Sequence, residues 1–146
     1  MMSQLKHANS FRELIVYQKS RAVAKRIFEI SKHFPKEEMY SLTDQARRSS
    51  RSVGAQIAEA WAKRLYEKHF VSKLTDADGE QQETQHWIDF AADCEYLTQE
   101  ELSSLKLELA EIGRMLNSMI EKAGSFCGES KLSVREYTVD YFSTDN

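Results

Sequence analysis

Four stretches of the chain carry apolar residues at steps of three and four, the spacing that lines one face of an α-helix. The first stripe consists of Val16, Ser20, Val23, Ile27, Ile30 and Phe34. The second runs from Leu42 to Ala60, the third from Phe70 to Ala91 and the fourth from Leu102 to Ala123. Four such segments with short connections predict an all-α fold, an antiparallel up-down-up-down four-helix bundle over residues 11–124.

Capping signals locate the starts of two of these helices. Ser10 and Glu13 have the spacing of a capping box, so the first helix is expected to begin at Phe11. Thr98 and Glu101 have the same spacing just ahead of the fourth stripe.

Proline and glycine mark further boundaries. Pro35 ends the first helix or opens the next segment, so the second helix begins there or near Ser41. Gly79 lies inside the third stripe, which keeps its phase across the glycine and therefore predicts one long helix. Gly124 follows the fourth stripe and is a candidate for the C′ cap.

The two ends of the chain lie outside the helical pattern. Residues 1–10 are expected to form an N-terminal tail and residues 125–146 a short C-terminal extension. Within this extension the stretch VREYTVDYF alternates loosely, which fits a short strand, a docked segment or a disordered tail. We prefer the disordered tail, because chain ends are ordered only where something holds them.

Composition narrows the class of protein. With 146 residues, 41% of them hydrophobic, the chain is one domain with a sizeable core, and one Pro and five Gly are too few for an all-β fold. No apolar run approaches the ~18 residues of a membrane span, and the start lacks the apolar stretch of a signal peptide. Cys94 and Cys127 lack metal-site spacing, so we expect reduced thiols in a cytoplasmic protein.

Charge is divided unevenly along the chain. Residues 1–74 carry 15 basic and 7 acidic side chains, whereas residues 75–146 carry 5 and 16. Such an asymmetry is a reason to look for charged partners. In a helix bundle, this charge asymmetry first predicts attraction between helix pairs, or between neighbouring subunits. Only the basic side chains that are not covered by this pairing are available to a phosphate backbone.

No motif in the sequence specifies catalysis. Glu83 and His86 have the Glu-x-x-His spacing of di-iron bundles, but the second such pair that these bundles need is missing. A calcium loop counted from Asp76 has the wrong residues at its sixth and twelfth positions. We therefore expect no enzyme activity, no cofactor, no metal and no small-molecule substrate.

The remaining candidates are basic and aromatic side chains of the first three helices. The basic candidates for a nucleic-acid contact or a protein interface are Arg47, Arg48, Arg51, Lys63, Arg64, Arg21 and Lys25. The candidates for oligomer or core contacts are Tyr17, Phe28, Phe34, Tyr40, Trp61 and Trp87. Arginine forks suit phosphate groups, but they also suit the acidic half of a neighbouring subunit. We favour the interface or a solvated face over RNA or DNA.

Several residues together match a family pattern. The matches in the first helix and the connection after it are Phe11, Leu14, Val16, Tyr17, Phe34, Pro35, Glu38 and Tyr40. Those in the second helix are Leu42, Gln45, Arg47, Arg48, Ser52, Val53, Ile57, Ala58 and Glu59, and weaker ones follow at Gly79, Glu83 and Leu97. With these residues the chain resembles the four-helix-bundle proteins linked to 23S rRNA intervening sequences, over about residues 11–124. It departs from their pattern at Ser20, Gln56, Ala60 and Glu80.

The resemblance implies a fold, an assembly and, for some relatives, a role. Family members form four-helix bundles that assemble as homopentamers. Some relatives are accessory proteins of diversity-generating retroelements, which bind nucleic acid and a reverse transcriptase through a basic surface. Our leading hypothesis is a non-enzymatic, self-assembling scaffold or binding module, and the alternative is a nucleic-acid-binding accessory protein.

Overall fold

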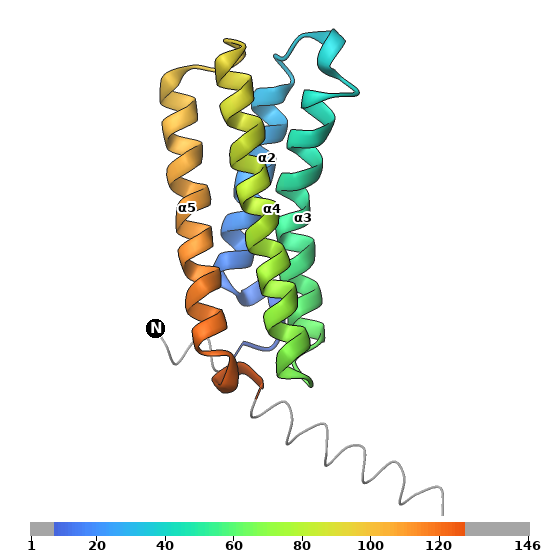
Figure 1. Ribbon diagram of the computed structural model, residues 1–146, viewed down its shortest axis with the longest axis vertical. Helices are drawn as coiled ribbons and strands as arrows, with labels where there is room; N and C mark the ends of the chain where they lie inside the picture. The colour runs from blue at the N-terminus through green and yellow to red at the C-terminus, as the bar shows by residue number, and fades with distance from the viewer. Residues whose placement is uncertain (1–7, 128–146) are drawn as a thin grey trace, which may run out of the picture.

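A computed structural model describes residues 8–127 of the chain. They form four long helices and two short 3-10 helices (Figure 1). In chain order these are η1 (Phe11–Glu13), α2 (Ile15–Ser31), η2 (Lys36–Glu38), α3 (Leu42–Ala62), α4 (Glu67–Asp93) and α5 (Gln99–Glu121). Residues 123–127 form a further helical turn, and the described chain contains no strand. The expected all-α fold is confirmed.

In Figure 1, α2 lies behind α4, with α5 on one side of them and α3 on the other. Each long helix packs against the next, and α5 also contacts α2. The ion pairs between α2 and α5 run in opposite order along the two helices: Lys19 pairs with Glu111 at 3.2 Å and Arg26 with Glu108 at 3.2 Å. The basic helix α2 is thus attracted to the acidic helix α5.

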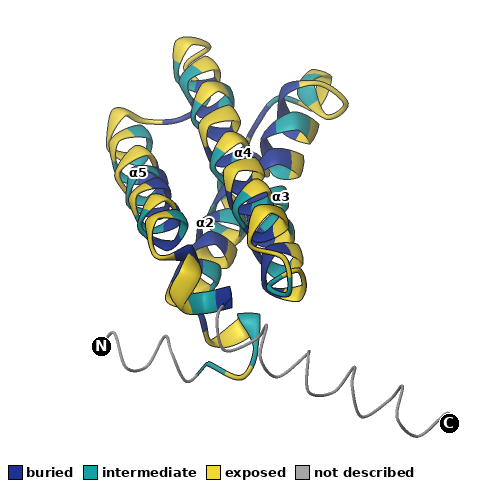
Figure 2. Ribbon diagram, turned by 60° about the horizontal axis from the view of Figure 1, so that its bottom comes forward, coloured by how far each residue is buried: buried dark blue, intermediate teal, exposed yellow. Residues whose placement is uncertain are grey.

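The four apolar stripes face one another and form the core. Figure 2 shows the buried positions turned toward the centre of the bundle and the exposed ones on its outside. The largest fully buried hydrophobic side chains are Leu14, Val53, Ile57, Phe70, Leu74, Ile88, Leu105, Leu109, Ile112 and Leu116. None of the described helices has both the length and the apolarity needed to cross a bilayer.

The first helix does not begin where the capping signal placed it. Ser10 caps only the short helix η1, where its hydroxyl accepts a hydrogen bond from the Arg12 amide at 3.2 Å. The Glu13 carboxylate accepts from the Asn9 amide at 2.7 Å, so no capping box forms. Leu14 is extended, with φ −69° and ψ 127°, and α2 begins after it. The reason is burial: this break lets Leu14 enter the core, where it is 1% exposed.

The other predicted boundaries agree better with the structure. Thr98 and Glu101 form both hydrogen bonds of a capping box at the start of α5. Pro35 precedes η2, and the second long helix begins at Leu42, next to Ser41, the later of the two starts considered. Helix α4 is continuous through Gly79.

The prediction for the end of α5 was wrong. The cap is Lys122, and Gly124 has no positive φ; it lies within the helical turn of residues 123–127. This turn is held by burial, because Cys127 is fully buried and the Phe126 ring stacks on Phe70 at 5.7 Å. The extension expected from residue 125 therefore begins with ordered residues. The strand, docked-segment and disorder alternatives for VREYTVDYF lie outside the described residues, as do residues 1–7.

Two leucines of α5 test how far the core determines stability. Leu105 is fully buried, whereas Leu107, two positions later, is 69% exposed. We expect Leu105→Ala to lower the free energy of unfolding by about 2–5 kcal/mol, because it removes buried methyl groups and leaves a cavity. Leu107→Ala is the matched control and should change it by less than ~0.5 kcal/mol. Urea denaturation measures both, and equal effects would contradict the placement of the core.

Candidate functional site

Helices α2 and α3 present an aromatic ring covered by arginines. Phe28 of α2 is half-buried, and the guanidinium carbons of Arg47 and Arg51 lie 4.8 Å and 5.6 Å from its ring centroid. A cation over an aromatic face is attracted by the negative charge density of the ring. The Arg47 Nε also donates a hydrogen bond to the Ser31 hydroxyl at 2.8 Å. Arg47 is therefore fixed against α2, while Arg51 remains exposed.

The arginines border a shallow hollow on the outside of α3. The hollow has a volume of about 560 Å³ and is lined by Met39, Tyr40, Asp44, Arg47, Arg48, Arg51, Ser52 and Ala55. Tyr40 stands at its edge with 95% of its surface exposed, and Met39 is 43% exposed. We call Met39, Tyr40, Arg47, Arg48 and Arg51 the α3 basic surface. It combines an exposed aromatic ring with positive charge.

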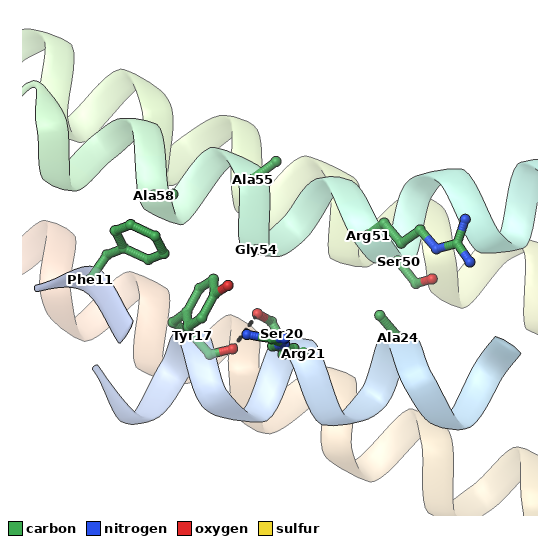
Figure 3. A pocket seen from close by; sticks show the side chains of 10 residues that line it. All are labelled: Phe11, Tyr17, Ser20, Arg21, Ala24, Ser50, Arg51, Gly54, Ala55 and Ala58. Atoms are coloured by element: carbon green, nitrogen blue, oxygen red, sulfur yellow. Dashed lines mark hydrogen bonds between the residues drawn. The ribbon is translucent and has the colours of Figure 1, made fainter. Parts of the chain in front are cut away.

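A narrower groove runs between α2 and α3 (Figure 3). It has a volume of about 320 Å³ and is lined by Phe11, Tyr17, Ser20, Arg21, Ala24, Ser50, Arg51, Gly54, Ala55 and Ala58. We call it the α2–α3 groove.

Its floor depends on a glycine. A Cβ at Gly54 would lie 3.2 Å from the Ser20 hydroxyl and 3.4 Å from the Tyr17 ring, so the missing side chain lets that ring lie close against α3. Phe11 closes one end of the groove, packing edge-on to Tyr17 at 4.9 Å.

The connection that carries Tyr40 is held by one cross-bundle hydrogen bond. The Tyr96 hydroxyl, between α4 and α5, donates to the Glu38 carboxylate at 3.0 Å, and the Ser41 hydroxyl donates to the same carboxylate at 2.7 Å. These donors hold the pKa of Glu38 below its usual value. The bond to Glu38 in turn raises the pKa of Tyr96 to about 12. The pair ties η2, and with it the start of the α3 basic surface, to the far side of the bundle.

The predicted basic residues do not form one cluster. Arg21 and Lys25 are exposed on α2, and Arg21 lines the groove together with Arg51. Lys63 is exposed at the C-cap of α3, at the end opposite to Tyr40.

Arg64 has a structural role beside Lys63. Its guanidinium carbon lies 3.5 Å from the Trp61 ring centroid, and its Nε donates to the Trp61 carbonyl at 2.8 Å. Burial lowers the pKa of this guanidinium, but arginine stays charged in proteins. Lys63 and Arg64 are therefore separate from the α3 basic surface.

The predicted aromatic residues divide between core and surface. Phe34 and Trp61 are buried at 9% exposure. Tyr17, Phe28 and Trp87 are half-buried, and Tyr40 alone of the six is fully exposed.

Several cations of the surface form no ion pair within the described bundle. Burial and Glu83 raise the pKa of Glu80 in α4, and the charge of Arg48 partly offsets this rise. Among residues 8–127, no ion pair engages Arg21, Lys25, Arg48 or Arg51. Lys19 and Arg26, by contrast, are paired with carboxylates of α5. The attraction between the halves of the chain thus uses Lys19 and Arg26 of α2 and leaves the outer cations of α2 without an ion pair among the described residues.

The side chains that suggested metal chemistry have structural contacts. The Trp87 indole donates to the Glu83 carboxylate at 3.1 Å, and His86 packs edge-on to Trp87 at 4.7 Å. In the described part of the chain no three His, Cys, Asp or Glu side chains are grouped so that they could hold a metal ion. Cys94 is exposed and Cys127 is buried, and neither forms a disulfide bond with another described residue.

Sequence signals for this site were incomplete. The arginines were candidates for nucleic-acid or interface contacts and Tyr40 a candidate for oligomer or core contacts, but the sequence did not predict that Tyr40 is exposed beside them. The hydrogen bond between Tyr96 and Glu38 joins residues 58 positions apart, and no local pattern could have shown it. The sequence analysis also did not predict the α2–α3 groove. The groove depends on the small residues of α3 and on the position of the Tyr17 ring close against Gly54.

Known proteins resemble this chain in both sequence and structure. The model of the 23S rRNA-intervening sequence protein family matches residues 12–118. A crystal structure from Bacteroides thetaiotaomicron, described as a protein with unknown function from the S23 ribosomal protein family, is similar at a TM-score of 0.67. That chain is 32% identical, over 73% of this chain and 96% of its own length. A comparison with curated proteins gave no match.

The pair of Tyr96 and Glu38 predicts a defined pH window. Because the pKa of Glu38 is lowered, its contribution to stability is present above pH ~4.5 and is lost as the pH falls through the folded-state pKa. Because the pKa of Tyr96 is raised to about 12, its contribution is present below pH ~10 and is lost as the pH rises toward 12.

We therefore expect Tyr96→Phe to destabilise the protein most between pH ~5 and ~10. Urea denaturation of both proteins across pH 3–11 measures the difference. A difference that stays constant over this range would contradict the hydrogen bond.

Proposed function

The chain belongs to the 23S rRNA-intervening sequence protein family, and from this premise we propose that it acts by binding and not by catalysis. We propose an antiparallel, up-down-up-down four-helix bundle that self-assembles in the cytoplasm as a homo-oligomer, a pentamer as the family resemblance implies. The opposite order of the ion pairs along α2 and α5 supports the antiparallel arrangement. The assembled protein serves as a scaffold or binding module.

The observation that carries this proposal is the α3 basic surface. Tyr40 exposes 95% of a large aromatic side chain beside Arg48 and Arg51, which form no ion pair with the rest of residues 8–127. Tyrosine and arginine are the residues that dominate binding energy at protein interfaces. An isolated subunit gains nothing from displaying them together.

The acidic helices of another copy supply a matching surface. Helices α2 and α3 carry 7 basic and 3 acidic side chains, whereas α4 and α5 carry 4 basic and 12 acidic ones. A contact between the basic face of one copy and the acidic face of the next is heterologous, because it joins two different surfaces. Repetition of such a contact closes into a ring when the rotation allows it.

Self-assembly is tested by light scattering after size exclusion at micromolar concentration. We expect a species of about five times the 16.9 kDa chain. Tyr40→Ala should shift it toward the monomer. Tyr66→Ala removes another exposed tyrosine, 59% exposed and at the opposite end of α3, and should leave the mass unchanged. A wild-type monomer, or equal effects of the two variants, would overturn the proposal.

A second candidate function, single-stranded nucleic-acid binding, is favoured by the same exposed ring. Arg48 is exposed beside Tyr40 and forms no ion pair with another described residue. Nucleic-acid strands bind where bases stack on aromatic side chains and cations contact the backbone. With this second function, the α3 basic surface would bind RNA or DNA and the protein would be a nucleic-acid-binding accessory protein.

A gel shift with single-stranded RNA at several salt concentrations tests this second function. We expect Arg48→Ala with Arg51→Ala to weaken binding and to reduce the slope of log affinity against log salt by about 0.7 for each phosphate that is no longer neutralised. Lys122→Ala removes an exposed cation at the end of α5 and is the matched control. If the double variant binds as tightly as the wild type, these arginines do not contact nucleic acid.

A further inference from the structure

We propose that the α2–α3 groove is a docking site for the acidic, aromatic C-terminal segment of the same chain, residues 136–146. The inference goes beyond self-assembly, and it concerns a different partner for this face of the bundle. It rests on the chemistry of the groove, the composition of the segment, and the place where the described chain ends.

The groove offers an apolar floor with positive charge at its rim. Small residues of both helices, Ala24, Gly54 and Ala58, leave room along its length, and Phe11 with Tyr17 forms an aromatic wall (Figure 3). Arg21 on α2 and Arg51 on α3 border it, and neither pairs with a carboxylate among the described residues. A ligand for this groove therefore has small apolar or aromatic groups together with negative charge.

The C-terminal segment has this composition. Its aromatic residues are Tyr137, Tyr141 and Phe142, and its acidic residues are Glu136, Asp140 and Asp145. It contains no lysine or arginine. Aromatic rings can stack on the planar guanidinium groups at the rim, while the carboxylates accept hydrogen bonds from them. The acidic end of the chain thus complements the arginines at the rim of the groove.

The described chain ends at the same end of the bundle as the groove. Phe126 stacks on Phe70 at 5.7 Å, in the first turn of α4, which residues 63–66 join to the end of α3. The groove residue Ala58 lies about one turn before that end of α3, at Ala62. Glu136 lies nine positions after Cys127, and nine extended residues span up to about 30 Å.

The groove itself is short enough for the segment to fill. It extends along α3 from Ser50 to Ala58, which is about 12 Å at the rise of an α-helix. The segment can therefore reach the groove and cover it.

Tethering favours the chain's own segment over that of a neighbour. A short linker holds a segment at an effective concentration in the millimolar range, far above that of other copies in solution. Docking would cover Arg51, which belongs to both the groove and the α3 basic surface. The segment therefore competes with whatever binds that surface.

Photo-crosslinking from position 141 in the full chain tests the inference. Benzoylphenylalanine replaces Tyr141, and mass spectrometry identifies the peptides to which it couples. We expect crosslinks to the groove-lining parts of α2 and α3, residues 17–24 and 50–58. Crosslinks spread over all four helices, or none to these two stretches, would overturn docking.

An isotope mixture separates docking within one chain from exchange between copies. The labelled variant is mixed with a ¹⁵N-substituted chain before irradiation. We expect only crosslinked peptides whose two parts carry the same isotope. Mixed-isotope pairs would overturn the same-chain assignment, whatever the oligomer size. Because the readout is a crosslink and not a mass in solution, its failure is distinguishable from a failure of self-assembly.

Charge-reversal variants test whether the arginines at the rim of the groove hold the C-terminal segment. Arg51→Glu should lower the crosslink yield about threefold, the scale of one exposed charge contact. Adding Asp140→Lys should restore it. Arg114→Glu makes the same reversal at an exposed position of α5 and should have no effect. Equal crosslink yields in all variants would refute the role of the arginines at the rim. Whether the segment docks at all is decided by the crosslinks of the chain that carries only the photo-crosslinker at position 141.

Discussion

The close packing of α3 against α4 is the constraint on which the rest of the bundle depends. The stripe of α3 that meets α4 contains small side chains, among them Ala46 and Ser49, both 1% exposed. The fully buried Thr84 of α4 donates a hydrogen bond to the Ser49 hydroxyl at 2.9 Å, deep between the two helices. Large side chains on this stripe would push the helices apart and break this interhelical bond, which would leave the two hydroxyls only the carbonyls of their own helices, Glu80 for Thr84 at 2.8 Å and Ala46 for Ser49 at 3.4 Å. With α3 and α4 fixed, α2 and α5 complete the core from the other side.

The cations of α2 and α3 fall into two groups in the bundle, those paired with α5 and those without an ion pair. Cations of α2 that face α5, Lys19 and Arg26, pair with carboxylates and help to close the bundle. Those that face away from α5, such as Arg21, and those on the outer side of α3, such as Arg48, have no such partner among the described residues. Exposed ion pairs contribute little stability, so apolar burial accounts for the fold. We propose that the remaining positive charge serves contacts with partners.

Sequence reasoning succeeded where a single periodic signal dominated. The fourth stripe and the Thr98 capping box predicted α5 closely, because local and tertiary preferences agree there. The Ser10 signal failed because burying Leu14 outweighed continuing the helix. The Gly124 signal failed because α5 ends earlier, at Glu121, and the burial of Cys127 places Gly124 inside a further helical turn. Both errors have the same cause: a buried side chain at a helix end overrides a capping preference of about 1 kcal/mol. For the site, the sequence pattern identified the arginines only as candidates. The packed bundle shows how they differ: Arg47 is fixed on Phe28, whereas Arg48 forms no ion pair within residues 8–127.

The departures from the family pattern have a structural meaning on this frame. Ala60 stands where the pattern has glycine, and it is fully buried in α3. Gln56 replaces asparagine one turn earlier, and its buried side-chain oxygen has no hydrogen-bond partner among the described residues. A change at a buried position acts through packing, whereas a binding function acts through residues that a partner can reach. The characteristic motif of α3 therefore contains two separable parts. The inward part adapts to the neighbouring helices and includes the half-buried Arg47, which lies on Phe28. The outward part consists of the exposed Arg48, which matches the family pattern, and the exposed Arg51. Relatives that differ inside the bundle can for this reason still share a surface.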